Sequence, residues 1–75
     1  MKTLEQLAVG CCARVEAIRG ADEIAIRLLE MGLTPGTNLT VVGTAPLGDP
    51  VELEVRGYRL SVRKSEASRV EIVPA

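Results

Sequence analysis

The chain has 75 residues, with nine lysines and arginines against ten acidic residues and a net charge of −1 at pH 7. A chain of this size forms one domain, residues 1–75, and buries only about 60 to 65% of its unfolded surface, which leaves little room for a deep catalytic cavity. The charges are spread along the chain, and Tyr58 is its one aromatic residue. Nucleic-acid binding is therefore disfavoured, because it requires a basic stripe and commonly uses stacked aromatic side chains.

The sequence predicts a chain that stays in the cytoplasm. It has no apolar run of the roughly eighteen residues that cross a bilayer, and its N-terminal residues lack the apolar core of a signal peptide. Cys11 and Cys12 are adjacent, and neighbouring cysteines are poorly placed to bridge each other without strain, which fits a reducing compartment. We therefore expect no direct insertion into a membrane.

The first half of the chain predicts a short helical turn, a strand and a longer helix. The strand covers about residues 13–19, and its alternation slips between Val15 and Ile18, which predicts a bulge. The helix is expected over residues 23–31, with Asp22 as its N-cap. Its buried stripe consists of Ile24, Ala25, Leu28, Leu29 and Met31, with Ile26 at the edge.

The segment from Gly32 to Gly36 predicts a rigid corner between this helix and the next strand. Gly32 can take the left-handed conformation that closes a helix, and Leu33 then folds back onto Leu28, as in a Schellman motif. Pro35 and Gly36 suit the two central positions of a type II turn. The corner is structural, because its polar atoms are used by backbone geometry.

A strand over about residues 37–44 leads into a loop, residues 45–50, which contains two prolines and Gly48. Asp49 is the only acid in this loop, and it invites a catalytic or cation-binding role. A general acid or base, however, requires a partner group and a pocket. The interpretation we favour is an Asx-type turn, in which the carboxylate accepts backbone N–H groups.

The C-terminal third predicts a hairpin that folds at Arg56-Gly57. Apolar and polar residues alternate on both sides of this dipeptide, so antiparallel pairing places favourable partners opposite each other. The expected pairs are Leu53 with Leu60, Val51 with Val62, and Glu54 with Arg59. Arg56 is an unfavourable first residue for a type I′ turn, so we expect a one-residue bulge in the loop.

The predicted fold is mainly β with one helix. A single helical turn over about residues 64–68 and a last strand over 69–73 complete about five short strands. Short sequential strands with a tight hairpin favour a small SH3-like barrel, whose closure removes most exposed sheet edges, with the helix inserted between the first two strands. A two-layer α+β sandwich, with the helix packed on an open sheet, is the competing architecture.

An ordered set of residues between about Leu4 and Val73 carries a family resemblance. The set is Arg27-Leu28, Met31-Gly32-Leu33, Pro35-Gly36, Ala45-Pro46, Gly48-Asp49-Pro50, Gly57, Leu60, Arg63, Glu66 and Ala67. Together these residues resemble the FeoA family of small cytosolic proteins of bacterial ferrous-iron uptake. The resemblance implies an SH3-like fold and an accessory role for the membrane permease FeoB. Metal-dependent repressors carry a similar domain at their C-terminus.

Cys11 and Cys12 are the candidate metal ligands, because the chain has no histidine and no further cysteine. First-row metal sites usually need three or four ligands, so carboxylates or a second molecule would have to complete the set. The interpretation we favour is that both residues are packed or partly exposed thiols. We expect no cofactor and no tight iron site in the isolated chain, and a metal bridge between two copies stays open.

The candidate partner-binding surface consists of apolar residues that the sequence does not assign to the core. They are Ile26, Leu29, Pro46 and Leu47, with Arg27 as a charged group at the rim. The alternative is that Leu29 closes the helix onto the sheet and Leu47 tucks under its loop.

The last third of the chain also has a local excess of positive charge. The residues are Arg56, Arg59, Arg63, Lys64 and Arg69. This excess either steers the domain to an acidic partner or a membrane surface, or simply solvates the sheet, with Arg59 paired to Glu54 across the hairpin.

Three classes of function remain. The resemblance implies an interaction module that docks on the cytosolic part of FeoB, and the fold equally suits a free-standing regulatory domain akin to the C-terminal domain of iron-dependent repressors. The second would need another protein, since these residues contain no DNA-binding helix-turn-helix. A small enzyme is disfavoured, because the sequence has no histidine, no nucleophile–base pair and no phosphate-binding glycine loop. Self-association stays open.

Overall fold

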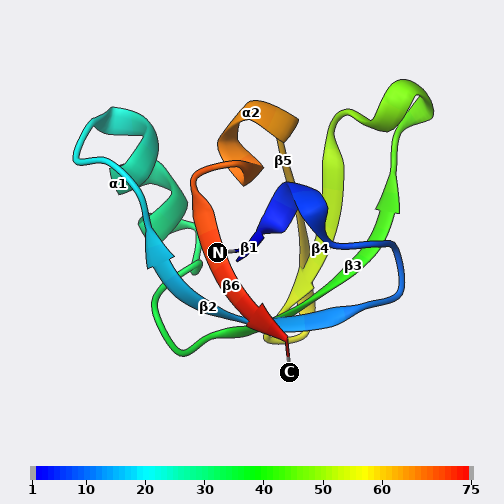
Figure 1. Cartoon of the computed structure of the whole chain (residues 1–75), viewed down its shortest axis with the longest axis horizontal. Helices are drawn as coiled ribbons and strands as arrows, with labels where there is room; N and C mark the ends of the chain where they lie inside the picture. The colour runs from blue at the N-terminus through cyan, green and yellow to red at the C-terminus, as the bar shows by residue number, and fades with distance from the viewer. Residues whose placement is uncertain (1, 75) are drawn as a thin grey trace.

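The computed structural model describes residues 2–74, which form one antiparallel sheet in the order β1-β6-β2-β3-β4-β5 (Figure 1). The strands are β1 Lys2–Thr3, β2 Cys12–Ile18, β3 Asn38–Thr44, β4 Val51–Val55, β5 Tyr58–Val62 and β6 Val70–Pro74. The helices are α1 Glu23–Glu30 and α2 Lys64–Ala67, and the 3₁₀ turns are η1 Leu4–Gln6 and η2 Pro46–Gly48. The predicted elements all occur in the predicted order, including the opening helical turn, whereas β1 and η2 are additional.

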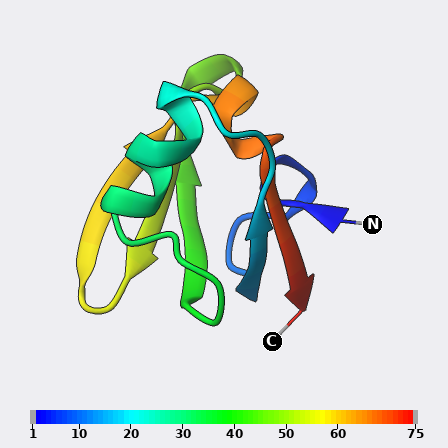
Figure 2. The same cartoon turned by 90° about the vertical axis from the view of Figure 1, so that its left-hand side faces the viewer.

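The expected SH3-like, mainly β class is confirmed, with two corrections to the sheet. A sixth strand, β1, precedes the five that were predicted, and it pairs Lys2 with Ile72 of β6, so α1 lies between the second and third strands. The sheet also stays open, because among residues 2–74 β5 pairs with β4 alone. Figure 2 shows β5 at the outer margin of the sheet, with α1 placed between it and β2.

The core lies on the concave side of this curved sheet. Strand β4 shows how the sequence builds it, because Val51, Leu53 and Val55 are buried while Glu52 and Glu54 point to solvent. The largest fully buried side chains are Leu4, Leu28, Leu33, Leu39, Leu53, Val15, Val41, Val55, Val62 and Val70. They come from η1, α1, the corner after α1 and five of the six strands, so the domain has one shared core.

The β2 bulge and the hairpin register follow the prediction, but the hairpin turn does not. The pairing of β2 with β6 shifts between Val15 and Ala17, and all three predicted cross-strand pairs of the hairpin are present. The loop is a two-residue turn without a bulge, with φ of 51° at Arg56 and 84° at Gly57. The Arg56 guanidinium donates a hydrogen bond to Oγ1 of Thr37 at 3.2 Å, which helps to hold this unfavourable backbone conformation.

The predicted Schellman motif closes α1. Gly32 has φ of 107°, and the N–H of Leu33 donates to the carbonyl of Leu28 at 3.2 Å. The hydroxyl of Tyr58 donates to the carbonyl of Met31 at 2.6 Å, so β5 is fastened to the end of the helix. A Cβ on Gly32 would collide with this hydroxyl, which the sequence did not reveal.

The turn at Pro35-Gly36 is also confirmed, and it is anchored to β2. The N–H of Thr37 donates to the carbonyl of Thr34 at 3.0 Å, and Gly36 has φ of 92°. The N–H of Gly36 reaches the carbonyl of Val15 at 2.8 Å. The corner therefore fixes where α1 sits relative to the sheet.

Candidate docking surface

Helix α1 exposes more apolar surface than its sequence predicted. It begins after Asp22, whose carboxylate accepts the N–H of Ala25 at 3.2 Å, as expected of an N-cap. The buried stripe is narrow, with Ala25 and Leu28 inside and Ile24 and Met31 half-buried. The exposed fractions of Ile26 and Leu29 are 52% and 38%. The idea that Leu29 closes the helix onto the sheet is therefore wrong, and both residues can meet a partner.

Arg27 connects α1 to α2. Its Nη2 forms an ion pair with Oε2 of Glu66, whose side chain is 9% exposed. The other carboxylate oxygen of Glu66 accepts the backbone N–H of Arg63 at 3.0 Å, at the start of α2. Both oxygens of this buried acid are thus used. The guanidinium of Arg27 is still exposed to solvent, but its ion pair with Glu66 means that it is not an unpaired charge at the rim of the docking surface, as the sequence suggested.

Pro46 and Leu47 do not join the α1 residues in one patch. They belong to η2, which lies at the opposite end of the long axis of the molecule from α1 (Figure 1). Leu47 is fully exposed and has φ of 74°, so it does not tuck under its loop. The structure thus divides the predicted surface into an α1 face and an η2 tip.

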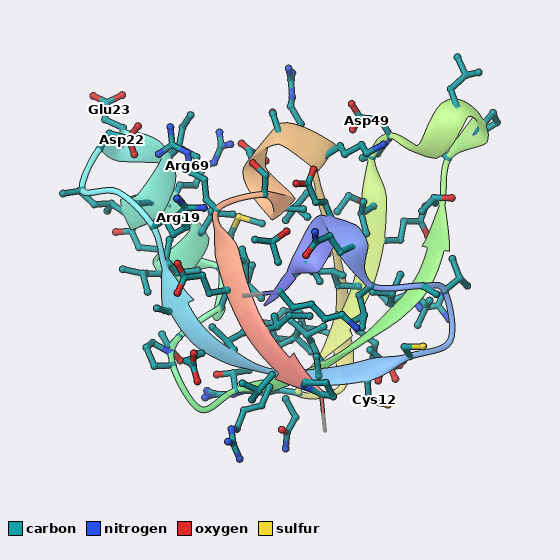
Figure 3. All side chains as sticks on the ribbon, in the orientation of Figure 1. Cys12, Arg19, Asp22, Glu23, Asp49 and Arg69 are labelled. Carbon is teal, nitrogen blue, oxygen red and sulfur yellow. The ribbon has the colours of Figure 1, made fainter. Side chains whose placement is uncertain are left out.

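Asp49 accepts a backbone N–H group, but not from its own loop. Its Oδ1 receives the N–H of Lys64, the first residue of α2, at 3.0 Å. The expected local Asx turn is therefore replaced by a contact between the loop and α2. This carboxylate has a structural partner, and Figure 3 shows it far from the other labelled acids, Asp22 and Glu23.

The two thiols stand apart from other potential ligands. Cys11 and Cys12 are both exposed and not joined by a disulfide, and Sγ of Cys12 lies 3.3 Å from Oγ1 of Thr40. Within residues 2–74 no group of three or more cysteine, aspartate or glutamate side chains is placed to hold a metal ion. The labelled Cys12 lies at the opposite side of the molecule from Asp22 and Glu23 (Figure 3).

Two arginines near the start of α1 form ion pairs. Nη1 of Arg69 lies 2.5 Å from Oδ1 of Asp22 (Figure 3). Nε of Arg19 lies 3.5 Å from Oε2 of Glu71. The hydrogen bond from Arg69, with the N–H of Ala25 as a second donor, lowers the pKa of Asp22 below its ordinary value. The charge of Arg69 is therefore paired, and Arg69 does not add to the local excess of positive charge that the sequence showed in the last third of the chain.

Tyr58 and Glu66 are the structurally important side chains that sequence reasoning missed. The contact of Tyr58 with Met31 spans 27 positions and has no local signal. Glu66 does have one, because it stands three residues after Arg63, where a capping glutamate is expected. The signal was hidden because Arg63 replaces the serine or threonine that usually begins this motif.

An open six-stranded sheet with one main helix and a shared core defines a small SH3-like β domain. The chain belongs to the FeoA family, because the family model described as FeoA domain matches residues 2–74. No helix within the described residues is long and apolar enough to cross a membrane.

The curated relatives include a much longer protein. The chain is 36% identical over 69 residues to the Fe(2+) transport protein A/Fe(2+) transporter FeoB fusion protein of Porphyromonas gingivalis strain W83. The match covers 92% of this chain but only 8% of the fusion protein. The chain thus corresponds to a small part of that polypeptide.

Solved structures of FeoA proteins have the same fold. Iron(II) transport protein A of Clostridium thermocellum matches with a TM-score of 0.91 and 32% identity, over 97% of this chain and 45% of that one. The zinc complex of Stenotrophomonas maltophilia FeoA matches with a TM-score of 0.85 and 34% identity, over 97% of this chain and 91% of that one. It is described as an SH3 domain protein and a candidate activating factor of ferrous iron transport.

A manganese-dependent transcriptional repressor, in complex with manganese, also matches. Its TM-score is 0.89, over 99% of this chain and 36% of the repressor. The identity is 16%, so this likeness concerns the fold alone.

Proposed function

We propose that this chain is a non-catalytic accessory protein of ferrous iron transport, which acts in the cytoplasm by docking on the cytosolic part of the FeoB permease. The observation that carries the proposal is the fusion relative, in which the FeoA-like part and the transporter belong to one polypeptide. Fusion raises the effective concentration of two modules for each other, and it is useful where they bind. Two separate chains of the same families would then have to associate through a surface.

The α1 face supplies the surface for this docking. Ile26 and Leu29 present apolar area on a helix whose two ends are fixed, by Asp22 at the start and by the Gly32 corner at the end. A rigid helix loses little conformational freedom on binding, so a modest apolar area can give a reversible affinity. The η2 tip, with Pro46 and Leu47, is a separate second surface.

This role does not require the chain to carry iron. The two exposed thiols lack a third ligand among the described residues, so we expect no one-to-one ferrous complex at micromolar protein concentration. An anaerobic titration of the reduced chain with ferrous iron tests this. Stoichiometric binding that is lost on replacing Cys11 and Cys12 with serine would contradict it.

The docking proposal is tested by a pull-down of this chain with the cytosolic part of FeoB, with and without guanine nucleotide. We expect specific retention in at least one nucleotide state, and weaker retention of Ile26→Glu. No retention of the parent chain in any state would refute the adaptor role. A regulatory role like that of a repressor's C-terminal domain is the second candidate, and its support is the likeness in fold.

A further inference from the structure

Strand β5 has a free edge, because within residues 2–74 β4 is its one neighbour in the sheet. A two-residue hairpin turn makes Val55 and Tyr58 a hydrogen-bonded pair, and the antiparallel ladder then alternates. The N–H and C=O groups of Tyr58, Leu60 and Val62 therefore face β4, and those of Arg59 and Ser61 face outward. Within residues 2–74 these outward groups have no backbone partner.

This edge has few of the features that normally prevent another strand from pairing. Strand β5 contains no proline, and its register with β4 has no bulge. A groove of about 320 Å³ borders its end; it is lined by residues 61–63, by Arg27 of α1 and Met31 at the C-cap of that helix, and by Pro50 and the acidic Glu66. Figure 2 shows α1 beside β5 along this margin. The protective features present are charge, from the exposed Arg59 and Arg63, and the neighbouring helix α1.

The two faces of β5 specify the chemistry of an additional strand. On the outer face the register places Thr40, Glu54 and Arg59 in one row across three strands, so an acidic residue beyond Arg59 would continue the alternation of charge. On the inner face Tyr58 is 44% exposed and Leu60 is half-buried, so an apolar residue fits beside them. The matching segment alternates acidic and apolar residues, as β4 already does on the other side of β5.

Charge disfavours a second copy of this chain at the same edge in two of the three antiparallel registers, whereas the third, centred on Leu60, places Arg59 opposite Ser61. Antiparallel pairing of two β5 strands centred on Ser61 places Arg59 of one copy opposite Arg63 of the other. Pairing centred on Arg59 places two copies of this arginine opposite each other. Like charges directly opposite destabilise a strand pair, whereas an acidic segment meets attraction in each of these registers.

We propose that the free edge of β5 binds an extended segment of the protein partner, in which acidic and apolar residues alternate, as an additional antiparallel or parallel strand. The backbone groups of Arg59 and Ser61 supply the hydrogen bonds, and the arginine side chains select the acidic segment. This inference rests on the proposed function for the identity of the partner, but the binding chemistry can be tested without FeoB.

The first test uses a fluorescent peptide of about nine residues that alternates glutamate with valine, and the same peptide N-methylated at every second amide. We expect the parent peptide to bind, and the amide protons of Arg59 and Ser61 to become protected from exchange. N-methylation should weaken binding by about tenfold or more, because it removes backbone N–H donors that the additional strand needs for pairing. Equal affinity for both peptides, or no binding up to millimolar peptide, overturns the inference. If protection of these amide protons from exchange rises with the concentration of the chain in the absence of peptide, the edge mediates self-association, and the inference is overturned as well.

The second test uses variants of the edge. Ser61→Pro removes an outward N–H and should abolish peptide binding without breaking the β4 ladder, whereas Ser61→Ala should bind like the parent. Arg59→Glu should weaken binding of the acidic peptide, and Arg59→Lys should restore most of it.

If Ser61→Pro fails to fold, the comparison of the parent peptide with the N-methylated peptide still tests the edge inference. If the parent chain and Ser61→Pro bind FeoB equally well, the edge inference fails and the adaptor role stands. If neither binds FeoB, the adaptor role fails, and the peptide result alone decides the edge.

Discussion

At Gly32 two independent constraints exclude a side chain. Its φ of 107° is unfavourable for any residue with a Cβ, and the hydroxyl of Tyr58 occupies the place that a Cβ would need. Gly36 has a similar φ of 92° but open space around it. We predict that Gly32→Ala lowers the free energy of unfolding by about 1 kcal/mol or more, and by more than Gly36→Ala, as measured by urea denaturation.

A double-mutant cycle separates the two causes at Gly32. Tyr58→Phe removes the hydroxyl, so the cost of Gly32→Ala should be smaller in the Tyr58→Phe background than in the parent. Equal costs in both backgrounds would show that the contact with Tyr58 is irrelevant. A Gly32→Ala variant as stable as the parent would disprove the helix-stop assignment itself.

The carboxylate of Asp22 connects helix capping to the pH dependence of stability. The hydrogen bond from Arg69 lowers its pKa in the folded chain, so the ionised form stabilises the fold above the pKa of the unfolded chain. This contribution is lost as the pH falls through the lower, folded pKa. We predict that Arg69→Ala moves the Asp22 titration, followed by carboxyl NMR, upward toward the ordinary range. Arg19→Ala is the matched control, because Arg19 pairs with Glu71, and an equal shift in both variants would contradict the assignment.

Elements with local signals could be predicted from the sequence, and contacts between distant elements could not. The cap at Asp22, the corner at Gly32 and the hairpin register all depend on neighbouring residues, and the structure has each of them. Strand β1 has two residues and pairs with β6 about seventy positions away, so no local sequence pattern predicts it. The exposure of Leu47 depends on η2 standing clear of the sheet, which the composition of its loop does not encode.

Helix α2 consists of one turn and depends on Glu66. Its carboxylate accepts the N–H of Arg63 and pairs with Arg27 from a buried position, so Glu66→Ala leaves that N–H without its acceptor. We predict that Glu66→Ala lowers the free energy of unfolding by about 1 to 3 kcal/mol, and that Glu66→Gln costs less, because an amide oxygen can still accept the N–H. Glu71→Gln is the control, since the partner of Glu71 is a largely exposed arginine and little loss is expected. Thermal and urea denaturation measure all three, and equal losses would contradict the role of Glu66.

At the scale of the whole molecule, the open sheet and the α1 face form neighbouring parts of one side. Arg27 of α1 lines the groove beside β5, and the same helix carries the exposed Ile26 and Leu29. The sequence suggested one patch that also included Pro46 and Leu47, because it could not show that η2 lies at the far end. A partner segment along β5 would contact the α1 wall, and the η2 tip would remain uncovered.

This arrangement predicts different effects from two similar charge insertions. Ile26→Glu places a carboxylate on the α1 face and should weaken binding of the cytosolic part of FeoB by about tenfold, by removing apolar contact and adding a desolvated charge. Leu47→Glu places the same group on the η2 tip and should change the affinity for the cytosolic part of FeoB by no more than about twofold. A tenfold change, by comparison, corresponds to about 1.4 kcal/mol of binding free energy. Both positions are exposed, so both variants should melt near the parent, and calorimetric titration gives the affinities. If Leu47→Glu weakens binding and Ile26→Glu does not, the partner docks on the η2 end, and the α1 face must be given up as the docking surface.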